Sequence, residues 1–402
     1  DIIGHTLATG MRKVILTDAA DARYLSTGHL VFLRRGTLFA VPFDAERLEV
    51  QGPAVAVLDT VAQALTAGNS NDVTGAGHFD VAPTGTLAWI RAPIAPSEEC
   101  ELVAVDRRGQ VARLPGPARA YAAKVRLSPD GRQLAVTVRD LTEAALWTHD
   151  LDRGTSTLLA GGGEADWPAW LPDGRRLAFS WLKDGRWLLA VQPADGTAPP
   201  QVLLERGPVP SSWTADGRRL AAVRRGDIVI VSLDDGKASA RPLFETPHTE
   251  RFPEFSPDGR WLAYGSNVSG RNDVYLRSYP GPGPAAQVSI DGGSDPAWHP
   301  SGRELFFVGP RNAADRRSMM AVDIATTPAL RIGRPKALFD FDLKSLAFVC
   351  SPLRCYDVSP DGQRFFTTRT LPAPPVTPIT HINLILNWFE ELKAKVPAGE
   401  AK

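Results

Sequence analysis

Short apolar segments alternate along the chain with a turn that carries proline, aspartate and glycine. The clearest copy spans residues 255–264, where an aromatic segment, the turn Pro257-Asp258-Gly259 and a second apolar segment follow one another. Proline presets the first corner of such a turn, and glycine accepts the positive φ that the next corner needs. The pattern therefore predicts a β-hairpin.

The hairpin pattern recurs along almost the whole chain. Its turn glycines are Gly28, Gly85, Gly131, Gly174, Gly217, Gly259, Gly302 and Gly362. From Gly131 to Gly302 successive copies are 42 or 43 residues apart, and the segments between them carry no helical stripe. A period near 40–45 residues with strand-like segments is typical of a β-propeller. The sequence predicts an all-β fold: one domain over residues 1–402, an eight-bladed propeller of four-stranded antiparallel blades, with seven blades as the alternative.

An aromatic residue stands four positions before the turn glycine in four consecutive repeats: Trp170, Trp213, Phe255 and Trp298. A buried aromatic side chain removes about 150–250 Å² from water. One small sheet cannot cover both of its own faces, so we expect these rings to lie between neighbouring blades. The alternative is an aromatic cage for a ligand.

Ring closure requires the two ends of the chain to share a sheet. The last repeat offers strands at residues 355–359, 364–368 and 382–386, and residues 12–16 are expected to complete that sheet from the N-terminal side. The two longer intervals between turns are interpreted as loops, one of them around residues 340–355.

The repeated Ser-Pro-Asp-Gly-Arg-x-Leu-Ala hairpin resembles the TolB-like, WD-repeat-like β-propellers of bacteria. Its best copies lie at residues 128–135, 172–178 and 256–263, and the likeness covers almost the whole chain. This motif specifies the fold much better than the function. One function that the resemblance implies is a TolB-like periplasmic scaffold.

Three further stretches resemble the C-terminal propeller region of bacterial serine/threonine protein kinases. They are residues 28–32 (GHLVF) with 36–44 (GTLFAVPFD), residues 356–365 (YDVSPDGQRF), and residues 386–393 (LNWFEELK). In those proteins a kinase and a membrane helix precede an extracytoplasmic sensor. The likeness implies an extracytoplasmic (periplasmic) location, alone or within a longer membrane-anchored protein. The kinase motifs themselves do not occur in this sequence, so kinase activity is not implied.

Charge and composition limit the classes of partner that the chain is expected to bind. Lys and Arg number 45, as do Asp and Glu, so the net charge is zero and the footprint of a nucleic-acid binder is missing. No apolar run approaches the roughly 18 residues of a membrane-spanning helix. Cys350 and Cys355 lie five positions apart and form either a disulfide, which would fit an oxidising compartment, or two reduced thiols.

Candidate binding residues come from aligning the segments just before each turn. Inner strands line the central channel of a propeller, so polar side chains there are expected at the channel mouth. These residues are Arg23, His78, Asp80, Lys124, Arg126, Trp167, Glu254, Asp295 and Asp357. The alternative is that charges of both signs pair with one another across a water-filled channel.

No catalytic constellation accompanies the repeats. The sequence has no Gly-x-Ser-x-Gly elbow, and its seven histidines show no metal-ligand spacing. We therefore expect a monomeric, non-catalytic sensor or interaction propeller without a cofactor, binding a small ligand or a protein at the channel mouth. The alternative from another class is a propeller enzyme, a lyase or lactonase-like hydrolase with a metal in the channel.

Overall fold

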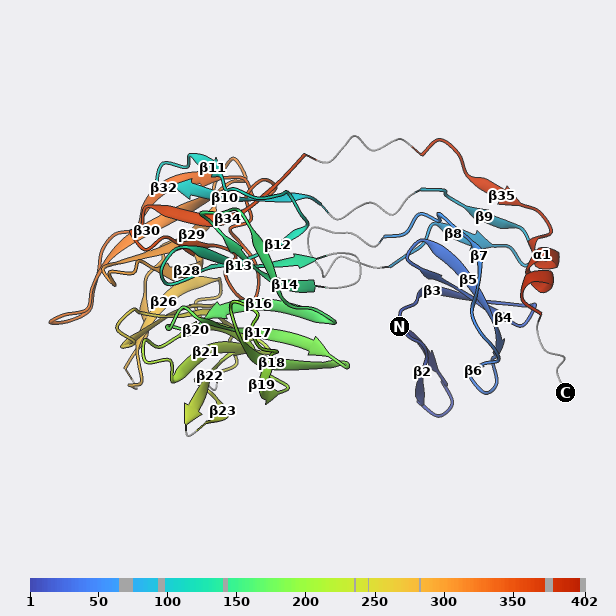
Figure 1. Cartoon of the computed structure of the whole chain (residues 1–402), viewed down its shortest axis with the longest axis horizontal. Helices are drawn as coiled ribbons and strands as arrows, with labels where there is room; N and C mark the ends of the chain where they lie inside the picture. Colours follow the sequence, from blue (N-terminus) through green and yellow to red (C-terminus); the bar gives the residue numbers. More distant parts are fainter. Residues whose placement is uncertain are drawn as a thin grey trace. The chain divides into compact units, whose positions relative to one another are not determined.

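The computed structural model describes residues 1–64, 75–92, 98–139, 144–234, 236–244, 246–281, 283–372 and 379–397, and nearly all of its regular structure is β-sheet (Figure 1). Two compact units make up the chain. Unit 1 comprises Asp1–Ser97 and Ala373–Lys402, and unit 2 comprises Glu98–Pro372. This division differs from the single domain over residues 1–402 that the repeats predict.

Unit 2 contains six of the repeated hairpins, each extended into an antiparallel sheet of four or five strands; one parallel bridge, from Ala144 to Glu164, joins the first two of these into a single eight-stranded sheet. The first four sheets in chain order are β12 (Tyr121–Leu127) to β15 (Ser156–Ala160), β16 (Glu164–Trp170) to β19 (Gln201–Glu205), β20 (Val209–Trp213) to β23 (Lys237–Pro242), and β24 (Glu250–Phe255) to β27 (Ala286–Gln287). The two middle strands of each of these four sheets are, in chain order, β13 (Gln133–Arg139) and β14 (Ala144–Asp150), β17 (Arg176–Lys183) and β18 (Arg186–Pro193), β21 (Arg219–Arg224) and β22 (Asp227–Asp234), and β25 (Trp261–Ser266) and β26 (Asp273–Ser278).

The fifth sheet consists of β28 (Ser294–Trp298), β29 (Glu304–Arg311), β30 (Arg317–Ala325), β31 (Arg331–Ile332) and β32 (Lys336–Phe341). The sixth sheet brings the two ends of unit 2 together, in the order β11 (Val111–Arg113), β10 (Cys100–Asp106), β34 (Arg364–Thr370), β33 (Asp357–Val358). The strands β12, β16, β20, β24, β28 and β33 contact one another in a closed circle, and we call them the inner strands.

Closure of the ring differs from the sequence prediction. Residues 12–16 and 382–386 do not complete the last repeat: β2 (Arg12–Leu16) pairs with β1 (Ile2–His5), and β35 (Asn383–Ile385) pairs with β9 (Leu87–Trp89). The physical reason is that β10 pairs with β34 along seven consecutive residues, so the edge of that sheet is already taken. The count of eight blades in one ring is not confirmed, because six inner strands close the circle of unit 2.

Unit 1 contains the first two repeats. One sheet has the order β3 (Ala20–Leu25), β4 (His29–Arg34), β5 (Thr37–Asp44), β6 (Glu49–Val50), with β7 (Val55–Leu58) also on β5. The other joins β8 (Phe79–Val81), β9 and β35. The helix α1 (Trp388–Lys395) buries Trp388 and Leu392 in the same core as Phe79 and Leu87.

The aromatic side chains before the turns lie between blades, as predicted. Trp170, Trp213, Phe255 and Trp298 are all buried, and each packs in a cluster with side chains of the preceding sheet. Two of them also bond to the preceding inner strand. The indole N–H of Trp170 donates to the Arg126 carbonyl at 3.0 Å, and that of Trp298 donates to the Glu254 carbonyl at 3.3 Å.

The repeated turn is held by a hydroxyl and a carboxylate. The Ser128 hydroxyl donates to Asp130 at 2.6 Å and accepts the backbone N–H of Gln133 at 2.9 Å. Asp130 in turn accepts the Arg132 N–H at 3.1 Å, which closes the turn. The same hydroxyl-to-carboxylate bond recurs at Thr214–Asp216, Ser256–Asp258 and Ser359–Asp361. The Ser-Pro-Asp-Gly pattern is therefore a structural device of the scaffold.

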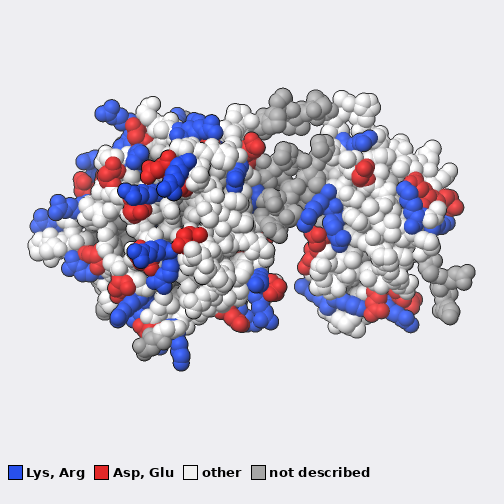
Figure 2. Space-filling model, in the orientation of Figure 1, with Lys and Arg blue, Asp and Glu red and all other residues white. Residues whose placement is uncertain are grey.

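The surface is mixed in charge. On the face shown in Figure 2, basic and acidic side chains are interspersed, in keeping with the zero net charge. Within the described part of the chain, no helix has the length and apolar character needed to cross a membrane.

Replacing Ser128 by alanine should weaken its turn. The hydroxyl is the largest cause that lowers the pKa of Asp130, so in the variant that pKa should rise toward its ordinary value of 3.8. We expect Ser128→Ala to lower the free energy of unfolding by about 1 kcal/mol near pH 7. A carboxyl whose pKa is lowered on folding contributes stability that is lost as the pH falls through the folded pKa, so the difference should shrink below about pH 4.

Urea denaturation of both proteins at pH 7 and pH 3.5 measures the effect, and an NMR titration follows the carboxyl. Ser239→Ala, at an exposed position of the outer strand β23, serves as the matched control and should change neither quantity. An unchanged Asp130 pKa in Ser128→Ala would contradict the proposed role of the hydroxyl.

Candidate functional site

The inner strands carry a β-bulge at corresponding positions. Their pairing with the next strand shifts between Asp166 and Ala169, between Arg251 and Glu254, and between Ser294 and Ala297. The bulges place Trp167, Phe252 and Asp295 at φ values of 55°, 56° and 56°. These non-glycine residues in the left-handed region need support from their surroundings.

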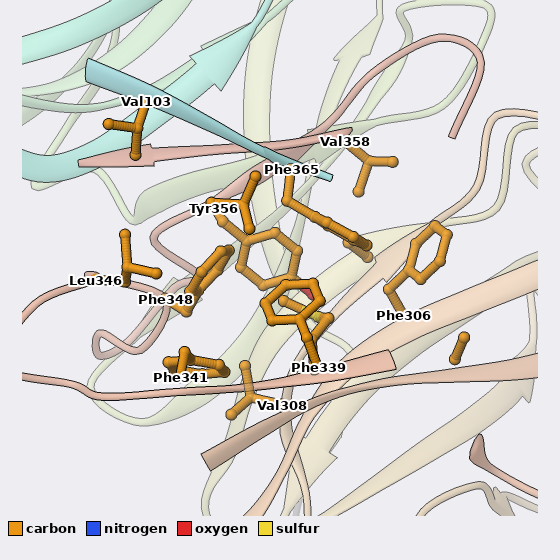
Figure 3. Close-up of a cluster of buried hydrophobic side chains, with 14 residues drawn as sticks. Val103, Phe306, Val308, Phe339, Phe341, Leu346, Phe348, Tyr356, Val358 and Phe365 are labelled. Atoms are coloured by element: carbon orange, nitrogen blue, oxygen red, sulfur yellow. The ribbon is translucent and has the colours of Figure 1, made fainter. Parts of the chain in front are cut away.

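A segment of the long loop between β32 and β33 lies inside the ring of inner strands. We call residues 349–355 the central loop. On either side of it, Phe348 and Tyr356 are buried and their rings stack edge to face at 5.5 Å between centroids. Figure 3 shows these two rings together with Phe339 and Phe365, in a buried cluster to which the fifth and sixth sheets both contribute side chains. Both ends of the central loop are thereby fixed.

The central loop is a small closed ring held by the inner strands. A disulfide joins Cys350 and Cys355, whose Cα atoms are 5.5 Å apart. At the tip, Leu353 is fully buried and packs in one cluster with Trp167 and Val223.

Backbone groups add further contacts between the central loop and the ring. The Phe252 N–H donates to the Pro352 carbonyl at 3.1 Å, and the Arg126 guanidinium donates to the Arg354 carbonyl at 3.0 Å. At the exposed side, Arg251 donates to the Ser351 hydroxyl at 2.9 Å.

Arg354 is the centre of a buried charge cluster. Its side chain is only 7% exposed and makes ion pairs with Glu254 and with Asp357, the latter at 2.9 Å, while its Nε donates to the Tyr356 carbonyl at 3.0 Å. Burial lowers the pKa of Arg354, but the two carboxylates outweigh burial and hold that pKa above its ordinary value. Asp357 also accepts the Leu127 N–H at 2.9 Å, so the cluster ties the last inner strand to the first.

Two further charges in this cluster lack full compensation. Arg126 is buried, and desolvation together with the neighbouring Arg354 charge lowers its pKa to about 10. Asp295 is fully buried, and neither of its carboxylate oxygens makes a hydrogen bond of normal geometry. Desolvation raises the pKa of Asp295 to about 7, although Ser294, the Cys350 N–H and the charges of Arg317 and Arg354 favour the ionised form.

A second charged group lies on the neighbouring inner strands. Lys124 forms an ion pair with the buried Asp166 and lies over the Trp167 ring, 4.3 Å from its centroid. Asp166 also accepts from Arg139 at 3.2 Å and from the Thr137 hydroxyl at 3.0 Å. Lys124 is therefore engaged by the protein itself.

The structure brings together six of the nine predicted binding residues. Lys124, Arg126, Trp167, Glu254, Asp295 and Asp357 lie on inner strands of unit 2, around or next to the central loop. The other three lie in unit 1. There Arg23 pairs with Asp21 and covers the Phe79 ring, His78 precedes β8, and Asp80 is exposed within it.

Sequence reasoning missed the central residues Arg354, Leu353 and Asp166. The first two stand between the paired cysteines, in the interval that was interpreted only as extra loop length. The unusual spacing of 60 residues between Gly302 and Gly362, with two cysteines inside it, is the signal that could have identified this segment.

The arrangement at the central loop consists of paired charges and apolar contacts. Within the described residues, no group of three or more His, Cys, Asp and Glu side chains is placed to hold a metal ion. The cluster instead places two carboxylates around a guanidinium and apolar side chains, Trp167 and Val223, around an aliphatic one. Both positions are filled by the central loop.

Removing the Asp295 charge should change how stability depends on pH. A carboxyl whose pKa is raised on folding contributes stability that is present below its unfolded pKa and lost as the pH rises through the folded value, here about 7. Asp295→Asn keeps the shape without the charge. We expect it to remove this loss and to raise the free energy of unfolding at pH 8 by at most about 4 kcal/mol.

Urea denaturation at pH 5 and pH 8 tests this expectation. Asp323→Asn, whose native side chain is 76% exposed on β30, is the control and should follow the wild type at both pH values. A wild-type pH dependence in Asp295→Asn would show that this carboxyl is not held in its neutral form.

Comparisons with known proteins agree with this architecture. The family model of the TolB beta propeller domain (PD40) matches residues 100–301, which is half of the chain and lies within unit 2. Among curated proteins, the "Uncharacterized peptidase YuxL" of Bacillus subtilis (strain 168) is 28% identical over 152 residues. That stretch covers 37% of this chain and 22% of the relative, so the chain spans roughly a fifth of the relative's length.

One solved structure shares this fold, and a second is similar at a lower TM-score. A protein of Agrobacterium tumefaciens described as TolB is similar with a TM-score of 0.54 and 20% identity, over 69% of this chain and 99% of that one. TolB from Acinetobacter baumannii has a TM-score of 0.42 and 13% identity, over 88% of this chain and 79% of that one. At such identities the likeness concerns the fold alone.

Proposed function

Because the chain belongs to the TolB beta propeller domain family, we propose that it is a non-catalytic interaction propeller that binds a partner at the end of the ring where the central loop lies. The observation that carries the proposal is the convergence of charged and aromatic side chains from several inner strands on one place. Arg126, Trp167 and Glu254 come from three different inner strands and meet at the central loop. The scaffold needs the repeats, but it does not need these particular side chains at this place.

A protein segment fits this site better than a small molecule held in a deep pocket. The central loop fills the buried part of the site, whereas Ser351 and the Arg251 side chain beside it are exposed. A partner would therefore first meet this exposed rim, where Arg251 carries a positive charge. Charged rim residues mainly guide encounter and partner choice, whereas buried anchors supply most of the affinity.

We also propose an extracytoplasmic location. The bond between Cys350 and Cys355 supports it, because disulfides persist in oxidising compartments and are rare in the cytosol. The remaining cysteine, Cys100, is buried, and burial raises the pKa of its thiol. The resemblance to the sensor region of bacterial kinases points to the same side of the membrane and stays a prediction.

Blocking of thiols in the protein recovered from the bacterial envelope tests the location. After unfolding in the presence of a maleimide, we expect one modified cysteine per chain, Cys100, and three after prior reduction. Three modified cysteines without reduction would contradict an oxidising compartment. Protein made in a reducing cytosol gives the reference for the reduced state.

Charge reversal at the rim tests the binding site. We expect Arg251→Glu to reduce capture of envelope proteins by the immobilised chain at least about tenfold, equivalent to about 1.4 kcal/mol. Arg241→Glu makes the same charge change at an exposed position of the outer strand β23 and should capture as the wild type does. Equal capture by both variants, or no capture by the wild type, would overturn the proposal.

A further inference from the structure

The central loop contacts the ring as a bound peptide would. It has an aliphatic anchor, Leu353, which is fully buried and packs in one cluster with Trp167 and Val223. It has a charged anchor, Arg354, held by two carboxylates. Interfaces between proteins are typically dominated by a few such desolvated anchors surrounded by weaker contacts.

Apart from the exposed Ser351 hydroxyl and the Cys350 sulfur of the disulfide, the remaining hydrogen bonds from the central loop to the ring use its backbone. The Pro352 and Arg354 carbonyls accept from Phe252 and Arg126, and the Cys355 carbonyl accepts the Thr367 hydroxyl at 3.2 Å. Backbone contacts of this kind are available to any peptide of similar shape. Which peptide the site selects therefore depends on the two anchoring side chains, Leu353 and Arg354.

The charges of the site call for a basic ligand. Glu254 and Asp357 flank the position of the guanidinium and carry the negative charge there. Without a cation in this position, only the Arg126 charge would remain to compensate two buried carboxylates, Glu254 and Asp357. Arginine suits the position because its planar fork can donate to both carboxylates at once.

From this arrangement we propose that the end of the ring is a recognition site for a peptide segment with an aliphatic residue followed directly by arginine, and that the chain's own disulfide-closed central loop occupies it. The inference rests on the proposed function, and it names the ligand class and the built-in competitor of that site. A partner peptide can bind only when the central loop leaves the site. The disulfide opposes this, because it keeps Leu353 and Arg354 presented together.

Tethering explains why the occupied state is the resting one. A ligand joined to its site by a short chain acts at an effective concentration in the millimolar range. A free peptide of the same sequence must therefore exceed about that concentration to displace the central loop. A variant whose loop has lost both anchors should bind the free peptide without this competition.

The probe is a fluorescein-labelled, disulfide-closed peptide with the sequence of residues 349–356 (Val-Cys-Ser-Pro-Leu-Arg-Cys-Tyr). Its binding to the whole chain is measured by fluorescence anisotropy. We expect the double variant Leu353→Gly/Arg354→Gly to bind the peptide at least tenfold more tightly than the wild type does.

Two matched controls locate the binding. A peptide with glycine in place of the leucine and the arginine should not bind the double variant. Adding Glu254→Gln and Asp357→Asn to the double variant should abolish binding of the native peptide. Binding of the native peptide that survives this change, or equal binding by wild type and double variant, would overturn the proposal.

A second variant covers the case in which the double variant does not fold. Cys350→Ser/Cys355→Ser keeps both anchors and removes only the closed ring, so Glu254 and Asp357 keep Arg354 as their partner. We expect it to bind the peptide more tightly than the wild type by severalfold. If this variant is folded by circular dichroism and binds no better than the wild type, the central loop is a structural filling and the proposal is wrong.

The peptide experiment needs no natural partner, so its outcome is separate from that of the proposed function. Peptide binding together with failed capture from the envelope would keep the recognition site and reject the partner proposal. Capture that depends on Arg251 while the peptide fails to bind would keep the function and reject this ligand class.

Discussion

A small sheet with two apolar faces is stable only when neighbours cover both faces, and this constraint governs unit 2. Each sheet places an aromatic ring, such as Trp170 or Phe255, against the sheet before it. The series ends only when the last sheet meets the first, which the pairing of β10 with β34 achieves. Because every inner strand then lies beside two others, the ring has no exposed end face.

A closed ring creates an axis that its own strands cannot fill. In this protein the central loop fills part of it, and the buried Arg354 compensates carboxylates that two different sheets contribute. Charges removed from water are tolerable only as a paired set. The incomplete compensation of Asp295 marks where this part of the molecule is least satisfied. The same feature makes the end of the ring a reasonable place for recognition.

Scaffold and site use different parts of each repeat. The Ser-Pro-Asp-Gly turn is consumed by bonds such as that from Ser128 to Asp130, which say nothing about a ligand. The residues just before it, at the bulge of the inner strand, vary from blade to blade and meet at the axis. A propeller of the TolB family can therefore keep its architecture while its recognition chemistry changes.

The sequence by itself determined the hairpins, the all-β class and the burial of the aromatic positions, because each depends on local turn chemistry and on a repeat spacing that can be counted. It also pointed to Arg126, Glu254 and Asp357, since inner strands share one axis. Only the tertiary structure decided that β10 closes the last sheet, that six inner strands form the circle, and that Arg354 lies between Glu254 and Asp357. These outcomes depend on which distant segments compete for one sheet edge or one buried position, and no local pattern records that competition.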